Sequence, residues 1–347
     1  MQFFAMLLAG IVLVGGIAGV AARSLEAGDE ARLTILYTND TRGYLQTCGC
    51  RHSGLGGLDR RATLIRQVRA EQSHVLVLDS GNQAEDAERA RVVLQAMGAM
   101  GYAAVGVGPL DLKIVDAFWK EAAAAGVPVC VSPPRPAGVP ETVPAVLRLE
   151  AGGVRVGVVA LAPPWPVPAG QGGGGGEGSE EAVWAAVESR LRELRAGSDL
   201  VVVLSQRGLA SDRALAQRAG RGGASSPPAA GLIDLLIGNA EARSLTAPEG
   251  IGRTWLLPTS ERGQEVGRVD VTFTATGLQF AWRRIPLDRT FGPEPVVEGI
   301  VGAYYAVQAQ RLLDASVGSV VGQAGPVKPP RDPEFTSEAA GIAIRHW

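Results

Sequence analysis

Apolar residues follow two patterns along this chain, continuous runs and helical spacing. Short continuous apolar runs are typical of strands buried on both faces, and they cover residues 33–38, 75–78, 103–107, 127–131, 200–205 and 232–237. Between these runs, apolar residues recur at helical spacing, as expected for helices with one buried face. This spacing predicts helices over residues 56–71, 84–100, 112–125, 180–196, 209–219 and 296–313.

Two pairs of strands are predicted to form hairpins. Residues 143–150 and 154–161 flank Ala151-Gly152-Gly153, and residues 266–273 and 278–284 flank Thr276-Gly277. Glycine-containing turns between such runs are typical of antiparallel strand pairs. Elsewhere strands alternate with helices, which favours a parallel or mixed central sheet covered on both faces. We therefore expect an α/β protein.

The N-terminal residues 3–22 form an unbroken apolar run long enough to cross a bilayer as a helix. No Lys or Arg precedes it, and the small residues Ala21 and Ala22 would permit cleavage before Arg23. A buried core helix is the alternative interpretation. We interpret residues 1–22 as a signal peptide or signal anchor. The protein is then exported, either periplasmic or held at the membrane through this segment alone.

The remaining chain divides into a linker at residues 23–32, a main domain at 33–288, and a C-terminal helix with a loosely ordered tail at 289–347. A hydrophobic content of 46% is sufficient for a full core. The net charge of −2 gives no electrostatic reason to expect a nucleic-acid partner.

The densest group of reactive side chains follows the first predicted strand. Asp40, Cys48, Cys50 and His52 stand in one loop, and α/β proteins place their chemistry where parallel strands end at their carboxyl edges. The chain has three cysteines and no Cys-x-x-Cys-His sequence, so covalent haem attachment is not encoded here.

The motifs around this loop follow a recognisable order. Thr38-Asn39-Asp40-x-x-Gly43 and Gly56-Gly57-x-x-Arg60-Arg61 are followed by Leu78-Asp79-Ser80-Gly81, Val203-Leu204-Ser205 and residues 233–238. This series resembles the 5′-nucleotidase (UshA-like) branch of the calcineurin-like metallophosphoesterases. The Cys48-Gly49-Cys50 form is similar to an exported subgroup that accompanies multihaem cytochromes. The resemblance implies a metallophosphatase-type α/β sandwich with mixed central sheets flanked by helices.

The resemblance also implies a two-metal site, in which paired divalent ions polarise phosphate and activate water. It places Asp40 at the first ligand position and Asn82 at the bridging position. The other ligand positions hold residues that do not match the family pattern: Arg42, Gly108, Gln206, Asn239 and Glu241. We therefore expect no cofactor, with residual Mn, Zn or Mg binding at Asp40 and Asn82 as the alternative.

Several roles remain open for the residues of these loops. Asp40 either caps its own loop, retains a metal with Asn82, or forms an ion pair with Arg42. Arg60 and Arg61 form either a solvated basic face or an anion site at the start of a helix.

Three interpretations also remain for the thiols. Cys48, Cys50 and His52 alternate, so an extended loop presents them on one side. In the first interpretation the loop is only structural and Cys130 is a core thiol. In the second these cysteines act as a thiol–disulfide pair. In the third Cys48, Cys50, His52 and Cys130 form a soft-metal site. If a disulfide forms, a bridge from Cys130 to Cys48 or Cys50 is favoured, because a Cys48–Cys50 ring is strained.

Three functions follow from these patterns. The first is a catalytically degenerate, exported phosphoesterase-like protein with a binding or redox-accessory role, its partner being a redox protein such as a cytochrome. The second is a metal-dependent phosphoric ester hydrolase with a rearranged or single-metal site. The third is a thiol redox protein that uses Cys48 and Cys50.

Overall fold

A computed structural model of the chain describes residues 32–47, 54–163, 180–220, 231–238 and 245–322. Its first β-sheet has the strand order β11-β10-β1-β2-β3. β1 (Arg32–Thr38) pairs in parallel with β2 (Val75–Asp79), which pairs in parallel with β3 (Ala104–Val105). On its other side β1 is antiparallel to β10 (Glu265–Thr274), which forms the predicted hairpin with β11 (Gly277–Pro286).

The second sheet is also mixed, with the order β4-β5-β6-β7-β9-β8. The parallel centre consists of β5 (Val154–Leu161), β6 (Leu200–Ser205), β7 (Leu235–Gly238) and β9 (Thr254–Leu257). Antiparallel strands flank it at both edges, β4 (Val146–Ala151) on β5 and β8 (Glu249–Ile251) on β9.

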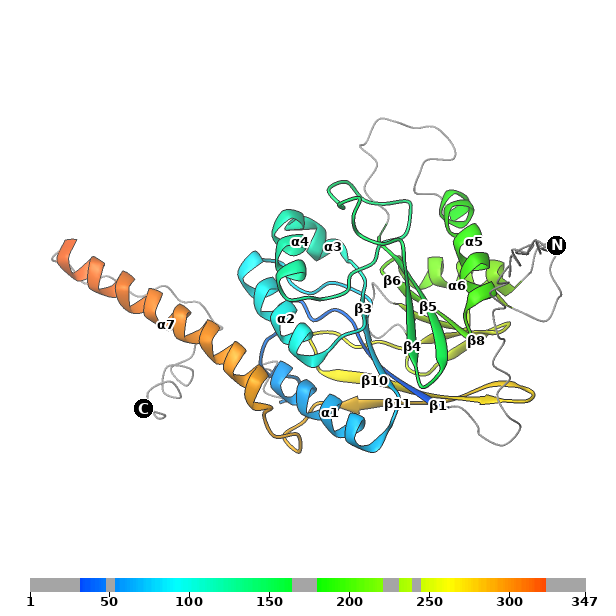
Figure 1. Ribbon diagram of the computed structural model, residues 1–347. Helices are drawn as coiled ribbons and strands as arrows, with labels where there is room; N and C mark the ends of the chain where they lie inside the picture. The colour runs from blue at the N-terminus through cyan, green and yellow to red at the C-terminus, as the bar shows by residue number, and fades with distance from the viewer. Residues whose placement is uncertain (1–31, 48–53, 164–179, 221–230, 239–244, 323–347) are drawn as a thin grey trace, which may run out of the picture. The chain divides into compact units, whose positions relative to one another are not determined.

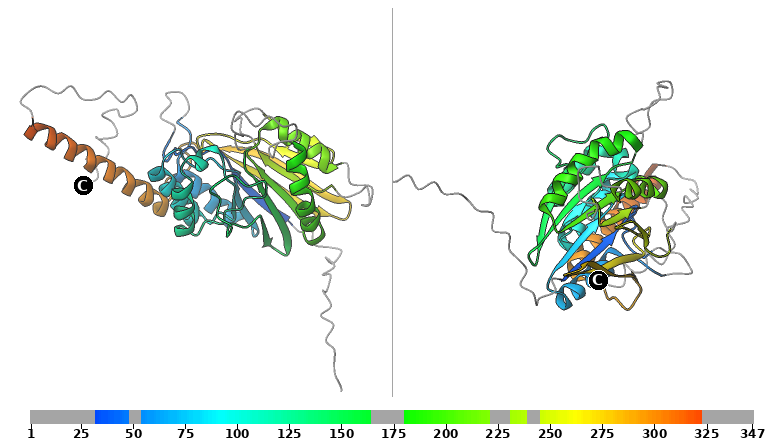
Figure 2. Two further views of the ribbon diagram at one scale, coloured as in Figure 1. Left: turned by 90° about the horizontal axis from the view of Figure 1, so that it is seen from above. Right: turned by 90° about the vertical axis from the view of Figure 1, so that its right-hand side faces the viewer.

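Three apolar clusters hold the sheets and helices together in four layers (Figures 1 and 2). One cluster lies between the sheets and contains alternate residues of β1, such as Ile35 and Tyr37. The opposite face of β1 presents Leu36 to α1 (Leu58–Glu71) and α2 (Ala87–Met100). The outer face of the second sheet packs on α5 (Glu180–Gly197) and α6 (Leu209–Gly220).

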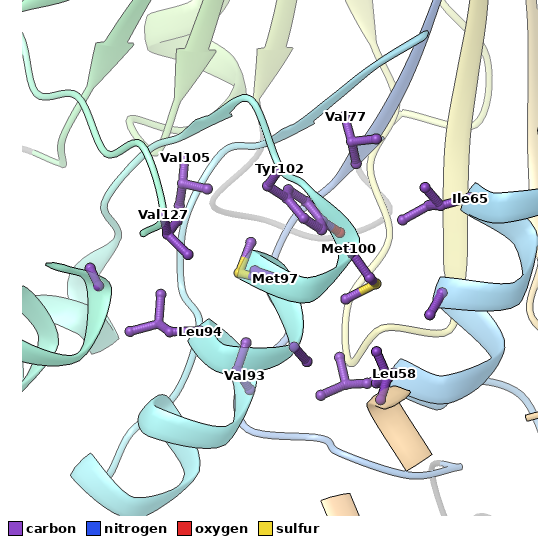
Figure 3. Close-up of a cluster of buried hydrophobic side chains, with 14 of the residues drawn as sticks. Leu58, Ile65, Val77, Val93, Leu94, Met97, Met100, Tyr102, Val105 and Val127 are labelled. Carbon is purple, nitrogen blue, oxygen red and sulfur yellow. The ribbon is translucent and has the colours of Figure 1, made fainter. Parts of the chain in front are cut away.

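The cluster under α1 and α2 shows why these helices form where they do (Figure 3). Leu58 and Ile65 of α1 lie in one buried cluster with Val93 and Met97 of α2, as helical spacing requires of one buried face. The N-cap Asp86 starts α2, because its side chain accepts a hydrogen bond from the backbone N–H of Arg89 at 2.8 Å.

One glycine is required by the packing between the sheets. Gly267 lies opposite Tyr37 in the β1–β10 register, and a Cβ there would stand 2.1 Å from the Tyr37 ring. The Tyr37 hydroxyl donates to the carbonyl of Pro258 at 2.8 Å and accepts from Trp282 Nε1 at 2.7 Å. A buried tyrosine of the first sheet thus satisfies its polar end in the loop after β9.

Most predicted elements are confirmed, and three predictions are wrong. The helix expected at 112–125 is divided at Ile114 into α3 (Pro109–Lys113) and α4 (Val115–Ala124), because Ile114 is not helical (φ −121°, ψ 35°). The strand expected at 127–131 is a single bridge, Val105 to Val129. There the chain leaves the first sheet, and the N–H of Ser132 bonds to Ala160 of the second sheet.

The third wrong prediction concerns the C-terminal helix, which was expected to end at residue 313. α7 (Pro295–Gly322) continues further, and its N-terminal part packs on α1 and α2. The short strands β8 and β9 were not anticipated. Within the described ranges no helix is long and apolar enough to span a membrane; the predicted signal or anchor at 1–22 lies outside them.

Candidate functional site

The loops after β1 and β2 carry the strained backbone of this protein. Asp40, Arg42 and Asn82 have φ values of 50°, 52° and 65°, and among the described non-glycine residues only Arg262 shares this left-handed conformation. Backbone hydrogen bonds hold these loops: Asp40 N to Gly81 O at 3.0 Å, Arg42 N to Asn82 O at 2.9 Å, and Arg262 N to Asp40 O at 2.6 Å. Strain of this kind clusters at functional sites.

Asp40 lies at the centre of these loops and is fully buried. Its Oδ1 accepts a hydrogen bond from Asn82 Nδ2 at 2.6 Å, and its Oδ2 accepts one from Arg42 Nη2 at 3.2 Å. The ion pair with Arg42 is therefore formed, and Arg42 also approaches Glu261 at 3.6 Å. Burial raises the pKa of Asp40 to about 6, although the bonds from Asn82 and Arg42 act in the opposite direction.

A chain of buried amide side chains continues from Asp40. Asn82 Nδ2 also lies 3.2 Å from Gln206 Oε1, and Gln206 Nε2 donates to Asn39 Oδ1. Asn39 Oδ1 accepts a second bond from Ser80 Oγ at 2.8 Å. These residues are almost fully buried, so their hydrogen bonds to one another satisfy groups that have lost contact with water.

Two further buried carboxylates, Asp111 and Asp79, hold the loop after β2 in place through hydrogen bonds. Asp111 accepts hydrogen bonds from the backbone N–H groups of Asn82, Gln83 and Gly108 at 2.7–2.9 Å, and burial raises its pKa to about 7. Asp79 accepts from Gly81 N at 2.7 Å and Gln83 Nε2 at 2.6 Å. Together they position Asn82.

A buried cation, Arg61, is connected to Asp79 through two hydroxyl groups. Arg61 Nη1 donates to the Tyr102 hydroxyl at 3.3 Å, which lies 2.9 Å from Thr38 Oγ1, and Thr38 donates to Asp79 Oδ2 at 2.5 Å. Arg61 is only 1% exposed, so the prediction of a solvated basic face is wrong at this residue. Its spacing from Leu58 and Ile65 places it on the buried face of α1, and this signal in the sequence was overlooked.

The remaining predicted site residues are distributed as follows. Gly108 lies against Asn82, since a Cβ at Gly108 would stand 2.2 Å from Asn82 Oδ1. Cys130 is a free, fully buried thiol in the cluster between the sheets, and burial raises its pKa to about 12. The favoured bridge from Cys130 is therefore not formed. Five candidates lie outside the described residues: Cys48, Cys50, His52, Asn239 and Glu241.

A two-metal centre does not fit the donor atoms that these loops present. The described residues contain no group of three or more His, Cys, Asp or Glu side chains placed to hold a metal ion. Both oxygens of Asp40 accept hydrogen bonds from side chains of the protein. Asn82 presents an N–H donor to Asp40, and Arg42 is a fixed cation. A pair of divalent ions needs several anionic or neutral electron-pair donors.

Known proteins resemble this chain in sequence over only part of its length. No family model matches the chain. A snake venom 5′-nucleotidase from Gloydius brevicauda is 39% identical over 110 residues, which is 28% of this chain and 18% of the venom protein. This match thus spans less than a fifth of that relative.

Solved structures match over a longer stretch. A 5′-nucleotidase precursor from Thermus thermophilus superposes with a TM-score of 0.62 at 21% identity, over 80% of this chain and 59% of that one. The calcineurin-like phosphoesterase YfkN from Bacillus subtilis gives 0.61 at 13% identity, over 82% and 99%. The predicted metallophosphatase-type α/β sandwich is confirmed. The predicted resemblance to the 5′-nucleotidase branch is confirmed as sequence similarity over the segment that the venom protein matches.

Proposed function

We propose that this chain, a relative of 5′-nucleotidases, is a catalytically degenerate member of the metallophosphatase fold with a binding or accessory role outside the cytoplasm. One observation carries the proposal. Both oxygens of Asp40, the carboxylate at the first ligand position, accept hydrogen bonds from Asn82 and Arg42. Each oxygen of Asp40 thus already serves a donor of the protein, and the cation that pairs with this carboxylate is Arg42.

The chemistry of the neighbouring positions supports the same conclusion. Two-metal hydrolysis requires ions about 3.5–4 Å apart that hold both the attacking and the leaving oxygen. Arg42 adds positive charge where a ligand is needed, and Asn82 is neutral at the bridging position. Gly108 offers no side-chain donor at all. The activity of the venom and Thermus proteins therefore does not transfer to this chain.

Metal analysis and a hydrolysis assay on the purified protein test this proposal. We expect far less than one equivalent of Mn, Zn or Mg per chain, and no turnover of a nucleotide or an aryl phosphate when these ions are added. The alternative function, an ester hydrolase with a rearranged or single-metal site, predicts turnover that disappears in Asp40→Asn. That result would overturn the proposal, and Asp116→Asn, at an exposed residue of α4, is the matched control.

The accessory role is proposed from the resemblance of the Cys48-Gly49-Cys50 loop to exported proteins that accompany multihaem cytochromes. A redox protein is then the expected partner. The test is purification of the chain from its own host under native conditions. We expect haem absorbance to co-elute with it and to be lost when Cys48 and Cys50 are changed to serine. Preparations without haem absorbance would contradict this partner.

A further inference from the structure

The buried amides join the two sheets. Asp40 and Asn82 stand in the loops after β1 and β2 of the first sheet, whereas Gln206 follows β6 of the second sheet. Asn82 Nδ2 lies 2.6 Å from Asp40 Oδ1 and 3.2 Å from Gln206 Oε1. One amide nitrogen therefore contacts an oxygen in a loop of the first sheet and an oxygen in a loop of the second sheet.

A second set of hydrogen bonds also runs between the loops of the two sheets. Gln206 Nε2 donates to Asn39 Oδ1, and Asn39 Nδ2 lies 3.4 Å from Thr259 Oγ1 in the loop after β9. All of these side chains are at most 5% exposed. The carboxyl edges of the two sheets are therefore connected by side-chain hydrogen bonds from which water is excluded.

The orientation of the Asn82 amide follows from its surroundings. Its Oδ1 accepts the backbone N–H of Leu110 at 2.9 Å. Since the oxygen faces a donor, the nitrogen must face the oxygens of Asp40 and Gln206. A partial positive charge thus lies between two oxygens, which is the place that a bound cation would occupy.

We propose that the amide of Asn82 substitutes for a structural cation and makes the joining of the two sheets independent of metal. This inference deepens the proposed function and rests on it only in requiring that no ion is bound beside Asp40. Replacing the neutral amide of Asn82 with a carboxylate would make the joining of the two sheets depend on a bound cation. In Asn82→Asp an oxygen would replace Nδ2 and face Asp40 Oδ1 at the 2.6 Å separation that the amide hydrogen now bridges. Two carboxylates so close repel strongly when both are ionised, so the variant is tested at a pH well above the pKa of both groups.

Thermal unfolding of the full chain tests the inference. Wild-type protein should have the same Tm in EDTA, MnCl2 and CaCl2. Asn82→Asp should lower the Tm in EDTA by about 5 °C or more, and millimolar MnCl2 or CaCl2 should recover most of that loss because the cation binds only the folded carboxylate pair. If the variant does not fold in EDTA, refolding in the presence of either ion gives the same readout.

The exchange of the two groups is the matched control. Asp40→Asn with Asn82→Asp again pairs one amide with one carboxylate, so it should be more stable in EDTA than Asn82→Asp alone and show no response to either ion. The inference is overturned if Asn82→Asp is as stable as wild type, or if neither ion recovers its stability. Phosphatase turnover would instead contradict the proposed function, and it is measured separately.

Discussion

Removal of a single hydroxyl group, in Tyr102→Phe, tests the buried connection between Arg61 and Asp79. The Tyr102 side chain is 4% exposed. Its hydroxyl accepts from Arg61 Nη1 at 3.3 Å and, because Thr38 donates its own proton to Asp79, donates to Thr38 Oγ1 at 2.9 Å. Phenylalanine keeps the ring and removes both hydrogen bonds.

The expected cost follows from the partners that remain. Arg61 keeps only the 3.1 Å bond to Thr41 Oγ1 among the described contacts, since its Nε has no partner there. A lost bond to a buried charged group costs about 1.5–3 kcal/mol, and a neutral one about 0.5–1.5 kcal/mol. Because Phe avoids burying a polar oxygen, we expect a net loss of about 3 kcal/mol in the free energy of unfolding. This corresponds to a Tm lower by roughly 5–10 °C.

Urea unfolding, followed by circular dichroism, gives the free energies of wild type, Tyr102→Phe and the control Tyr305→Phe. The Tyr305 ring is half-buried on α7, and its variant should stay within about 0.5 kcal/mol of wild type. A double-mutant cycle with Thr38→Val should give a coupling of at least about 0.5 kcal/mol, as expected for groups in one network. A Tyr102→Phe variant as stable as the control would refute the reasoning.

Three further predictions concern protonation, the buried thiol and export. Burial raises the pKa of Asp40 to about 6 and of Asp111 to about 7, so the folded protein retains protons that the unfolded chain releases near pH 4. The urea midpoint should fall from about pH 4 to about pH 7 and then level off; a rise over this window would contradict these shifts. Cys130 should react with iodoacetamide only after unfolding, when tested in a chain with serine at 48 and 50, and rapid labelling of the folded protein would argue against its burial. A C-terminal reporter that is active only outside the cytoplasm should be active, and an intact but silent fusion would exclude export.

The fold could be predicted because its strands have strong local signals. β6 has the predicted bounds, and β1 differs by one residue, since strands buried on both faces are continuous apolar runs. β8 and β9 escaped prediction because they are short and their pairing depends on neighbours distant in the sequence. The segment at 127–131 has the composition of a strand, but its hydrogen bonds do not continue along either sheet.

The site was predicted less completely, because partners cannot be assigned from residue types alone. The pattern located Asp40, Asn82 and Gln206 at strand ends that converge, and one of the alternatives for Asp40, the ion pair with Arg42, is formed. Asn39 and Ser80 belong to the same network, yet nothing in their spacing distinguishes them from ordinary loop residues. One of the alternatives for Cys130, a core thiol, is formed, and its place between the sheets depends on the crossing of the chain at that point.

Arg42 and Asn82 both donate hydrogen bonds to the same side chain, Asp40. Asp40 is fully buried, and a buried carboxylate without partners is strongly destabilising. Arg42 and Asn82 each supply one N–H donor to it, and Arg42 also offsets its charge through the ion pair. It follows that a change at either position alone leaves Asp40 with an unsatisfied oxygen. Conversion toward a metal-binding pattern at one position should therefore cost more stability than a coordinated exchange, because each of the two side chains satisfies a different oxygen of Asp40.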